Sequence, residues 1–242
     1  MAPVLVWSQN LILNSSFEEI IDCPSDFDQL DKLEDWKSVG GTVDVFSDCS
    51  IEIVPDPPQG PFEYATFEFG ESYIYLGISF PFRYKSDTLF REFIQGETTE
   101  ILSDNPHYFS LYAFTNQENR TNHLGVYFSE NDNGFIGSYP KDIEPQLEFD
   151  DWIGDYRQWK KHEGCVEDIG GSNYLTIGNF HVPGNDEVEF EDVEFSNWLF
   201  IDNLILQEIP VLSDTLITIY NGECIELQST LNNIPLAYYN QE

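Results

Sequence analysis

One stretch near the end of the chain, NWLFIDNLILQ from Asn197 to Gln207, constrains the fold more than any other. Successive side chains of a β-strand point to opposite sides, and both sides of this stretch are apolar. One side carries Trp198, Phe200 and Leu204, and the other carries Leu199, Ile201 and Ile205. A strand that is apolar on both sides is buried on both sides. The stretch therefore predicts a strand inside a layered β structure.

A second apolar stretch lies almost at the start of the chain, in NLILNSSFEE from Asn10 to Glu19. Leu11 to Leu13 form a short apolar run, and Asn14 to Ser16 follow it as a turn signal, a pattern that is typical of a strand. We expect this first strand to lie against the stretch from Asn197 to Gln207, so that the beginning and the end of the domain close a sandwich.

Strand signals recur at regular intervals between these two ends. In residues 107–114 and 123–129 the apolar side chains keep a period of two, and few segments have a helical period. Aromatic residues make up 15% of the chain, against one Met, and aromatic side chains favour pleated, half-buried surfaces. We expect an all-β, jelly-roll β-sandwich. The expected strands are 10–13, 43–45, 72–80, 89–95, 107–114, 123–129, 152–160, 174–180 and 197–207, with one short helical turn within residues 30–36.

The chain divides into three parts on this reading. Residues 1–9 resemble the tail of a secretory signal peptide, with an ordinary first strand as the alternative. Residues 10–208 form the sandwich. Residues 209–242 begin at a change of pattern, and two short apolar runs flank Asn221-Gly222 there. Because so few residues cannot bury a core alone, we expect a linker and the truncated start of a second β domain.

The charge of the chain limits its partners. It has 10 Lys and Arg against 44 Asp and Glu, a formal net charge of −34, which repels a phosphate backbone and excludes nucleic acid as a partner. Such acidity fits a highly soluble secreted protein, a binder of divalent cations, or a protein from salty water, and the sequence leaves these three open. No apolar run approaches the roughly 20 residues of a membrane helix.

The four cysteines suggest disulfides rather than catalysis, because the chain has the features of an exported protein. Cys23 and Cys49 are the better pair, since both lie in polar turns. Their bridge would close a loop that is worth about 3 kcal/mol in the chain-entropy model. The sequence leaves open whether Cys165 and Cys224 form a disulfide with each other or are unrelated.

Enzyme motifs are mostly absent. The sequence has no Gly-x-Ser-x-Gly, no phosphate-binding Gly-rich loop with Lys, and no His-Glu-x-x-His. His162 and Cys165 supply only half of a zinc pattern. Residues 129–134 are similar to a calcium loop, but Pro140 stands where such a loop needs a bidentate Glu, so a hairpin turn is favoured. A pair of carboxylates at glycosidase separation could occur anywhere among 44 acidic residues.

An ordered set of short blocks resembles a known family. Asn10 to Glu18 is similar to the opening of jelly-roll carbohydrate-binding modules, the galactose-binding-like β-sandwiches. More narrowly, the set resembles a domain of Bacteroidota cell-surface proteins associated with gliding motility and type IX secretion. Residues 213–227 resemble the opening of an Ig-like repeat. The blocks are FEE at 17–19, CP at 23–24, GGTVDVF at 40–46, YLGI at 75–78, REFIQ at 91–95, GVYFS at 125–129, YLTIGNF at 174–180 and FIDN at 200–203.

The resemblance implies a structural calcium ion between the first and last strands. Carried over by position, Glu18 and Asp202 are the expected side-chain ligands, with backbone carbonyls completing the oxygen shell that Ca²⁺ prefers. The family has a second aspartate where this chain has Asn203 and a proline where it has Val43. The alternative is that Glu18 caps a turn and Asp202 is solvated. An unpaired carboxylate in so apolar a strand is costly, which favours the ion.

The same resemblance implies a sugar site, which needs aromatic faces and a few hydrogen-bonding groups. Most aromatic residues of a sandwich belong to its core, so the sequence does not rank the candidates. The candidates are Trp36, Tyr64, Tyr84, Trp152, Tyr156 and Trp159, all in or beside expected loops.

These observations lead to two expectations about function. The first is a non-catalytic carbohydrate-binding module of a secreted protein, at the outer-membrane exterior or in the periplasm, with a polysaccharide or glycan as its partner. The second is a structural or adhesive spacer in a surface, motility or secretion assembly, with envelope proteins as its partners and no sugar site. An enzyme is the least favoured class.

Overall fold

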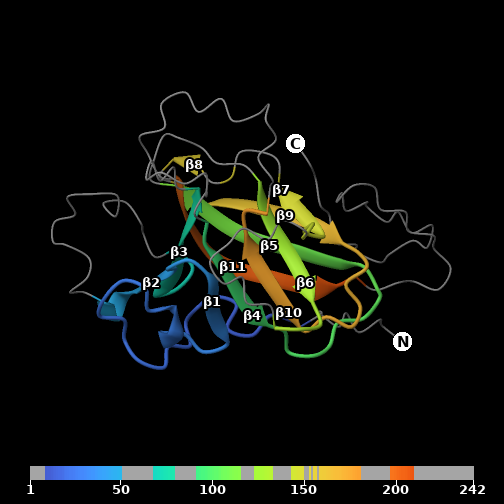
Figure 1. Ribbon diagram of the computed structural model, residues 1–242, viewed down its shortest axis with the longest axis horizontal. Coiled ribbons are helices and arrows are strands. Elements are labelled where there is room, and N and C mark those ends of the chain that lie inside the picture. Colours follow the sequence, from blue (N-terminus) through green and yellow to red (C-terminus); the bar gives the residue numbers. More distant parts are fainter. Residues whose placement is uncertain are drawn as a thin grey trace, which may run out of the picture.

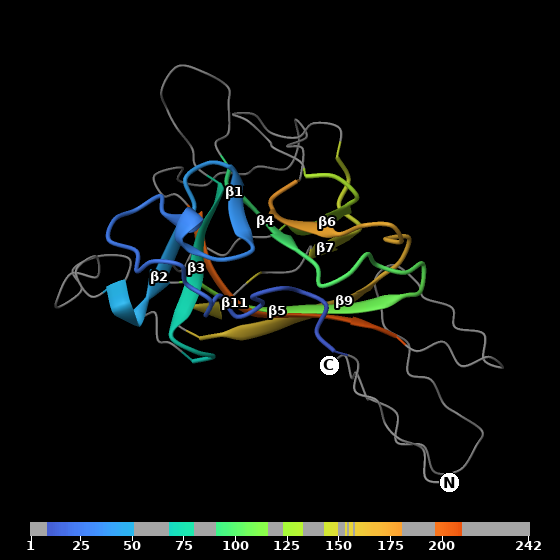
Figure 2. The ribbon, with the colours of Figure 1, turned by 90° about the horizontal axis from the view of Figure 1, so that it is seen from below.

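The structure, a computed structural model, describes residues 9–50, 68–79, 91–115, 123–132, 143–149, 153, 155–156, 158–180 and 197–209. These residues form two sheets that pack face to face, as Figure 1 shows. The view from below shows the sheets as two layers (Figure 2). The expectation of an all-β, jelly-roll sandwich is confirmed. Of the segments expected at residues 1–9 and 209–242, residues 1–8 and 210–242 lie outside the described residues.

The first sheet has five strands in the order β1-β4-β10-β6-β7, and every neighbouring pair is antiparallel. Its central strands pair without interruption, because Leu175 and Ile177 of β10 lie opposite residues of both β4 and β6. The strands are β1 (Trp36–Gly40), β4 (Phe93–Glu97), β10 (Tyr174–Gly178), β6 (Leu124–Ser129) and β7 (Leu147–Phe149).

The second sheet has six strands, in the order β2-β3-β11-β5-β8, with β9 pairing to β5 beside this path. All pairs are antiparallel except that of β5 with β8. The strands are β2 (Asp44–Ser47), β3 (Ser72–Ser79), β11 (Asn197–Glu208), β5 (His107–Thr115), β8 (Asp155–Tyr156) and β9 (Lys160–Val166). Two short 3₁₀ helices, η1 (Leu30–Lys32) and η2 (Asp48–Ser50), complete the described elements.

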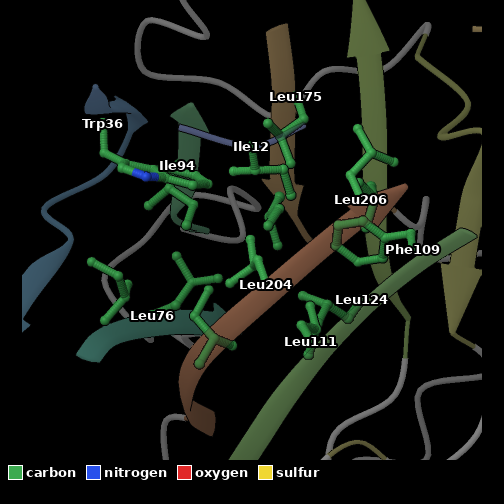
Figure 3. Packing of buried hydrophobic residues seen from close by; sticks show 14 of the residues in the cluster. Ile12, Trp36, Leu76, Ile94, Phe109, Leu111, Leu124, Leu175, Leu204 and Leu206 are labelled. Carbon is green, nitrogen blue, oxygen red and sulfur yellow. The ribbon is translucent and has the colours of Figure 1, made fainter. Parts of the chain in front are cut away.

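The core lies between the sheets and consists of the alternate side chains that each strand turns inward. Residues from both sheets, such as Ile94 of β4 and Leu204 of β11, point toward one another across it (Figure 3). Both are fully buried. Burying one such aliphatic side chain is worth about 1.5–3 kcal/mol, so the period-two pattern of the sequence is what holds the layers together.

Strand β11 is buried on both sides, as expected. Leu199 and Ile201 belong to the core, and Phe200 is fully buried on the opposite side. The predicted assignment of Leu204 to the same side as Phe200 is wrong. The register shifts between Asp202 and Ile205, and Asn203 has a φ of 49°, so that Leu204 turns into the core.

The stretch from Asn10 to Ser15 closes the sandwich, but it is not a full strand. It makes one isolated bridge, from Ile12 to Thr98. The Leu11 amide donates to the Leu206 carbonyl of β11 (2.8 Å), while the Leu13 amide donates to the Glu97 carbonyl of β4 (3.1 Å). The segment thus joins the edge of one sheet to the other, and the predicted contact between the beginning and the end of the domain is confirmed. We call residues 10–15 the clasp.

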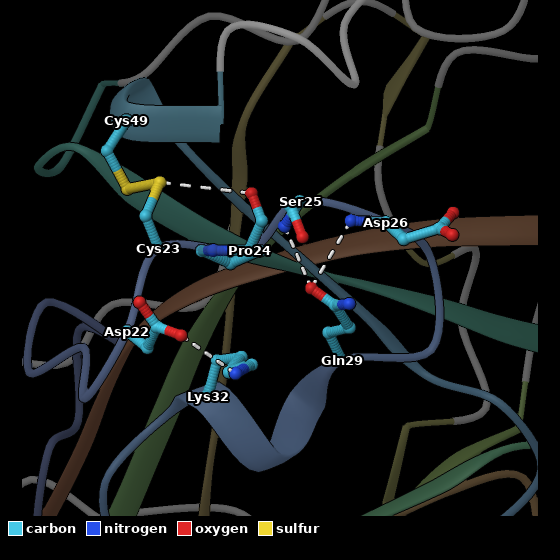
Figure 4. A network of polar contacts seen from close by, with 8 residues as sticks. All are labelled: Asp22, Cys23, Pro24, Ser25, Asp26, Gln29, Lys32 and Cys49. Atoms are coloured by element: carbon cyan, nitrogen blue, oxygen red, sulfur yellow. Dashed lines mark hydrogen bonds and ion pairs between the residues drawn. A yellow bond between two sulfur atoms is a disulfide. The ribbon is translucent and has the colours of Figure 1, made fainter.

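A disulfide holds the irregular segment that follows the clasp. Cys23 and Cys49 are bonded, as predicted, and the bridge spans 26 residues of sequence (Figure 4). Lys32 of η1 forms an ion pair with Asp22 beside it (2.9 Å). Cys165 also takes part in a disulfide. Cys224 lies outside the described residues.

Two parts of the strand prediction need correction. Residues 152–160 do not form one strand: β8 ends at Tyr156 and β9 begins at Lys160. The helical turn expected within residues 30–36 is shorter: η1 covers only Leu30–Lys32, and Trp36 begins β1. In both places the local pattern was weak and pairing with a neighbouring strand decided the structure. Within the described residues, no helix has both the length and the apolar character to cross a membrane.

Candidate functional site

Glu18 lies just after the clasp, at the end of a tight turn in which Phe17 has a φ of 60°. Its carboxylate accepts hydrogen bonds from the amides of Glu71 (2.9 and 3.0 Å) and Ser72 (3.0 Å), at the start of β3. Gly70 is required beside it, because a Cβ there would come within 2.1 Å of Glu18 Oε1. The side chain therefore ties the first turn to the second sheet.

Asp202 is the second predicted calcium ligand, and it lies on β11 with only 1% of its surface exposed. Its Oδ1 accepts one hydrogen bond, from the amide of Asn203 (2.6 Å). Burial raises the pKa of Asp202 to about 7, the Asn203 amide opposes this shift, and the negative charge of Glu18 adds to it. The two predicted ligands are thus close enough to repel each other. No Lys, Arg or His of the described part of the chain forms an ion pair with either one.

This pair fits a hard divalent cation in its chemistry. Both groups are carboxylates, and a cation between them would replace repulsion by attraction. No group of three or more His, Cys, Asp or Glu side chains gathers as potential metal ligands among the described residues. A cation at this position would therefore depend on backbone carbonyls as well as on Glu18 and Asp202. The calcium ligand set remains a prediction.

Trp36 does not belong to a surface sugar site, contrary to its place among the candidates. It is 4% exposed and belongs to the core. Its ring packs edge-on against Phe17 at 5.1 Å between centroids, and its Nε1 donates to the carbonyl of Asn14 (3.0 Å). Gly96 of β4 lies against the ring, where a Cβ would come within 2.8 Å of it. Trp36 is the residue against which the first turn packs.

Trp159 is half-buried against the outer side of the six-stranded sheet. Its ring lies 5.5 Å from that of Phe114 and 6.2 Å from that of Tyr73. These rings belong to a cluster that we call the outer aromatic cluster, consisting of Phe46, Tyr73, Tyr75, Phe114 and Phe200, with Trp159 and Trp198 packed against it. Of the remaining candidates, Tyr156 lies on β8, while Tyr64, Tyr84 and Trp152 lie outside the described residues.

A polar row crosses the outer side of the five-stranded sheet, and the sequence analysis did not find it. Lys37 of β1 lies opposite Gln95 of β4, Gln95 lies opposite Thr176 of β10, and Thr176 lies opposite Tyr127 of β6. The neighbours of these residues along the strands, such as Ile94 and Ile177, face the core. The row is therefore on the side of the sheet away from the core. We call these four residues the polar row.

The floor of the polar row has an unsatisfied acceptor. Gln95 Nε2 donates to Thr176 Oγ1 (3.0 Å), but Gln95 Oε1 is buried and has no hydrogen-bond partner. Gln95 is 1% exposed and Thr176 is fully buried. A buried polar atom without a partner costs about 1–3 kcal/mol, and such atoms are few in native proteins. A ligand hydroxyl that donates a hydrogen bond to Gln95 Oε1 would remove this cost.

Three side chains form the rim of the polar row, and each reaches solvent. Tyr127 and Tyr174 are half-buried, and Lys37 lies over the Tyr174 ring with its Nζ 5.8 Å from the centroid. The Lys37 ammonium also forms an ion pair with Asp132, whose side chain is 56% exposed. Asp132 was part of the calcium-like loop of the sequence analysis, and this ion pair is its observed contact.

One end of the same sheet face is closed by aromatic packing. The ring of Phe93 lies over Gly178 and that of Phe180 over Gly125, where a Cβ would come within 2.2 and 2.6 Å of the rings. Both phenylalanines are 2% exposed, and Tyr127 packs against them. These rings are structural, and they hold Tyr127 at the boundary between the closed end and the polar row.

The other buried carboxylates are engaged by the backbone. Glu92 accepts from the Gly77 amide (2.6 Å) and from Thr42, and its pKa is raised to about 7, mainly by burial. Asp44 accepts from the Asp28 amide (2.6 Å), and burial raises its pKa to about 6. Each of them joins two segments of chain. Cys165 is disulfide-bonded, so the half zinc pattern of His162 and Cys165 is coincidental.

Comparison with known proteins finds several similar solved structures. No protein-family model and no curated protein matches the sequence. The carbohydrate-binding module TmCBM61, solved with β-1,4-galactotriose, is 14% identical, with a TM-score of 0.39, over 84% of this chain and 100% of that one. The K3 cleaved adhesin domain of Lys-gingipain from Porphyromonas gingivalis is 14% identical, with a TM-score of 0.42, over 81% and 96%. The CBM22-1 xylan-binding domain from Paenibacillus barcinonensis Xyn10C is 11% identical, with a TM-score of 0.41, over 79% and 99%.

Proposed function

We propose that residues 10–208 are a non-catalytic carbohydrate-binding module of a secreted cell-surface protein, and that the polar row is its sugar site. The observation that carries this proposal is the buried Gln95 Oε1, which has no partner. Its neighbour in register, Thr176, lies opposite the half-buried Tyr127 and two positions after the half-buried Tyr174. Sugar sites combine a few hydrogen-bonding groups with aromatic faces. The polar row offers an amide, a hydroxyl, a phenol and an ammonium in one line across four strands.

A rigid sheet supports this role better than a loop. Gln95 and Thr176 lie on the central strands β4 and β10, which pair with neighbours on both sides. Their positions are therefore set before any ligand arrives, which lowers the entropy lost on binding. Binding without chemistry is supported by the state of Glu92 and Asp44, since both carboxylates already accept backbone hydrogen bonds.

Export is supported by the cysteines. Cys23, Cys49 and Cys165 are all in disulfides, and disulfides persist in oxidising compartments. We accordingly place the protein outside the cytoplasm, at the cell surface.

The test is retention on glycans with a matched pair of variants. Tyr127→Ala removes a half-buried ring from the rim, while Tyr112→Ala removes a half-buried ring from the outer side of the other sheet, where Tyr112 packs on Phe69 at 4.2 Å. On a glycan array, the wild type and Tyr112→Ala should bind the same glycans. Tyr127→Ala should lose about tenfold in affinity, because the contact of a sugar ring with an aromatic face is worth about 1–2 kcal/mol. Failure of the folded wild type to bind any glycan would contradict the proposal and favour a spacer.

We further propose that Glu18 and Asp202 hold one structural Ca²⁺. The support is the repulsion between the exposed Glu18, which binds the start of β3, and the buried Asp202 of β11. A cation bound only by the folded state stabilises it by about 2.7 kcal/mol at a hundredfold excess over its dissociation constant. The ion would join the first turn to the last strand.

A chelator tests the calcium site. The melting temperature should fall when the chelator is added and recover with Ca²⁺, while Mg²⁺ should restore it poorly because it requires tighter octahedral geometry. Asp202→Asn should abolish the Ca²⁺-dependent shift, and Asp132→Asn, at an exposed ion pair, should retain it. A wild type whose melting curve ignores both the chelator and Ca²⁺ has no such site.

A further inference from the structure

We infer that the ligand of the polar row is an uncharged glycan, and that acidic and sulfated polysaccharides are rejected. The inference rests on the sugar site proposed above and adds the chemical class of its ligand. Two independent features carry it: the direction of the unsatisfied hydrogen bond in the floor, and the charges that surround the rim.

The floor of the polar row requires a ligand group that donates a hydrogen bond. Gln95 Oε1 can only accept a hydrogen bond, and Thr176 Oγ1 already accepts one from Gln95 Nε2, so its own hydrogen is available to donate. The floor thus presents one acceptor and one donor in adjacent positions on β4 and β10. A sugar hydroxyl both donates and accepts, and a pair of hydroxyls on neighbouring carbons satisfies both groups. A carboxylate or a sulfate only accepts, and would leave Gln95 Oε1 without a partner.

The charges near the floor also oppose an anion. Glu97 follows Gln95 on the same side of β4, and its side chain is exposed. Asp132 lies at the rim beside Lys37. The whole chain has a formal net charge of −34. A negatively charged polysaccharide therefore meets a negative potential during approach and at the site itself.

Lys37 does not make the potential at the site favourable for an anion, because its positive charge is already paired. Its ammonium pairs with Asp132 and lies over the ring of Tyr174. Exposed ion pairs of this kind are worth at most about 1 kcal/mol, so the side chain can swing away from Gln95, its neighbour in register. In this position Lys37 acts as a movable cover of the floor, and its stem offers apolar surface to a sugar ring.

Affinity electrophoresis of the full chain tests the inference. The probes are three neutral polysaccharides, a galactan, a xylan and a β-glucan, and two acidic ones, polygalacturonate and alginate. We expect retention by at least one neutral polysaccharide and by neither acidic one, with retention unchanged in about 1 M salt, where the Debye length is about 3 Å. The double variant Gln95→Leu with Thr176→Val should weaken neutral retention at least tenfold, because two hydrogen bonds of about 1 kcal/mol each are lost.

The outcomes separate this inference from the function on which it rests. Retention by an acidic polysaccharide that disappears at high salt overturns the neutral ligand and leaves carbohydrate binding in place. Neutral retention that is unchanged in the double variant overturns the position of the site. Absence of retention on every polysaccharide overturns the proposed function itself. Thermal unfolding of the double variant checks that lost retention is not lost folding: the variant should melt cooperatively, because both partners of the buried hydrogen bond are replaced by apolar groups of similar shape.

Discussion

The outer sides of the two sheets use aromatic residues in opposite ways. On the six-stranded sheet, the outer aromatic cluster packs ring against ring, and Phe114 and Phe200 are at most 1% exposed. On the five-stranded sheet, the rim rings Tyr127 and Tyr174 are half-buried and flank a polar floor. The six-stranded side thus packs its rings against one another, whereas the five-stranded side keeps two rings beside polar side chains.

The difference between the two sheets shows that the number of aromatic residues on a face is a poor guide to a sugar site on this fold. Phe200 lies within 5.4 Å, centroid to centroid, of Tyr73, Tyr75 and Phe114, so it has little surface left to offer a ligand. A binding face instead needs rings that keep one side toward solvent and polar atoms that the protein leaves unsatisfied. The five-stranded sheet has both.

The largest expected effect is on stability and lies in the outer aromatic cluster. Phe200→Ala should lower the free energy of unfolding by about 3–5 kcal/mol, as large aromatic truncations in cores do. Tyr127→Ala should lower it by only about 1 kcal/mol, because that ring is half-buried. Chemical denaturation of both variants gives the two values. Equal losses of unfolding free energy in the two variants would show that the outer sides of the two sheets are packed alike, and would contradict the difference described above.

A smaller effect comes from the carboxyl of Asp44, which lies opposite Tyr75 on the aromatic side. Its pKa is raised from 3.8 to about 6 by burial, so the unfolded chain ionises first as the pH rises, and the native state loses stability between about pH 4 and pH 6. Asp44→Asn should therefore stabilise the protein by roughly 2 kcal/mol above pH 6 and by nothing below pH 4. Asn keeps an oxygen acceptor for the Asp28 amide.

Urea unfolding of Asp44→Asn and the wild type at several pH values measures this difference, because the titration of all other groups cancels between the two proteins. A gain that is the same at pH 4 and pH 7 would show that the charge of Asp44 is not what opposes burial.

The smallest expected effect on stability comes from the polar row. Replacing both partners of a buried hydrogen bond by apolar groups of similar shape is nearly neutral, so Gln95→Leu with Thr176→Val should change the free energy of unfolding by less than about 1 kcal/mol. The sign should favour the variant, since the unsatisfied Gln95 Oε1 is removed. A loss of several kcal/mol in thermal or urea unfolding would mean that the floor is structural, like the aromatic side.

The sequence predicted the parts of the fold that depend on local pattern. The period-two run of β5 and the doubly apolar β11 were predicted almost to their ends. The contact between the clasp and β11 and the disulfide between Cys23 and Cys49 were also expected. Strand β9 was not, because KKHEGCV is polar on one side and has a weak apolar pattern on the other. Its place is set by pairing with β5.

The candidate site depended on register, which no local pattern contains. Lys37, Gln95, Thr176 and Tyr127 are far apart in sequence and meet only because four strands pair in one alignment. The sequence contains one usable signal: Gln95 and Thr176 are polar residues at alternate positions of apolar strands, which marks the outward side. Trp36 was misplaced for the opposite reason, since its polar neighbours suggest a loop, whereas a turn closed by Phe17 buries it.

The clasp also determines how this domain responds to mechanical force. Its hydrogen bonds to β11 run antiparallel, with Leu11 beside Leu206 and Ser15 beside Leu204, so the chain enters and leaves at the same place. A pull on the two ends therefore peels these bonds one after another rather than loading them together. Peeling reaches Cys23, and the force then passes through the disulfide to Cys49, because the chain between these two residues, which are 26 positions apart, is shielded from tension. Reduction of that bond should lengthen the fully extended chain by about 80–90 Å, at roughly 3.5 Å per residue. The extended length of the unfolded domain therefore reports whether the disulfide is oxidised or reduced.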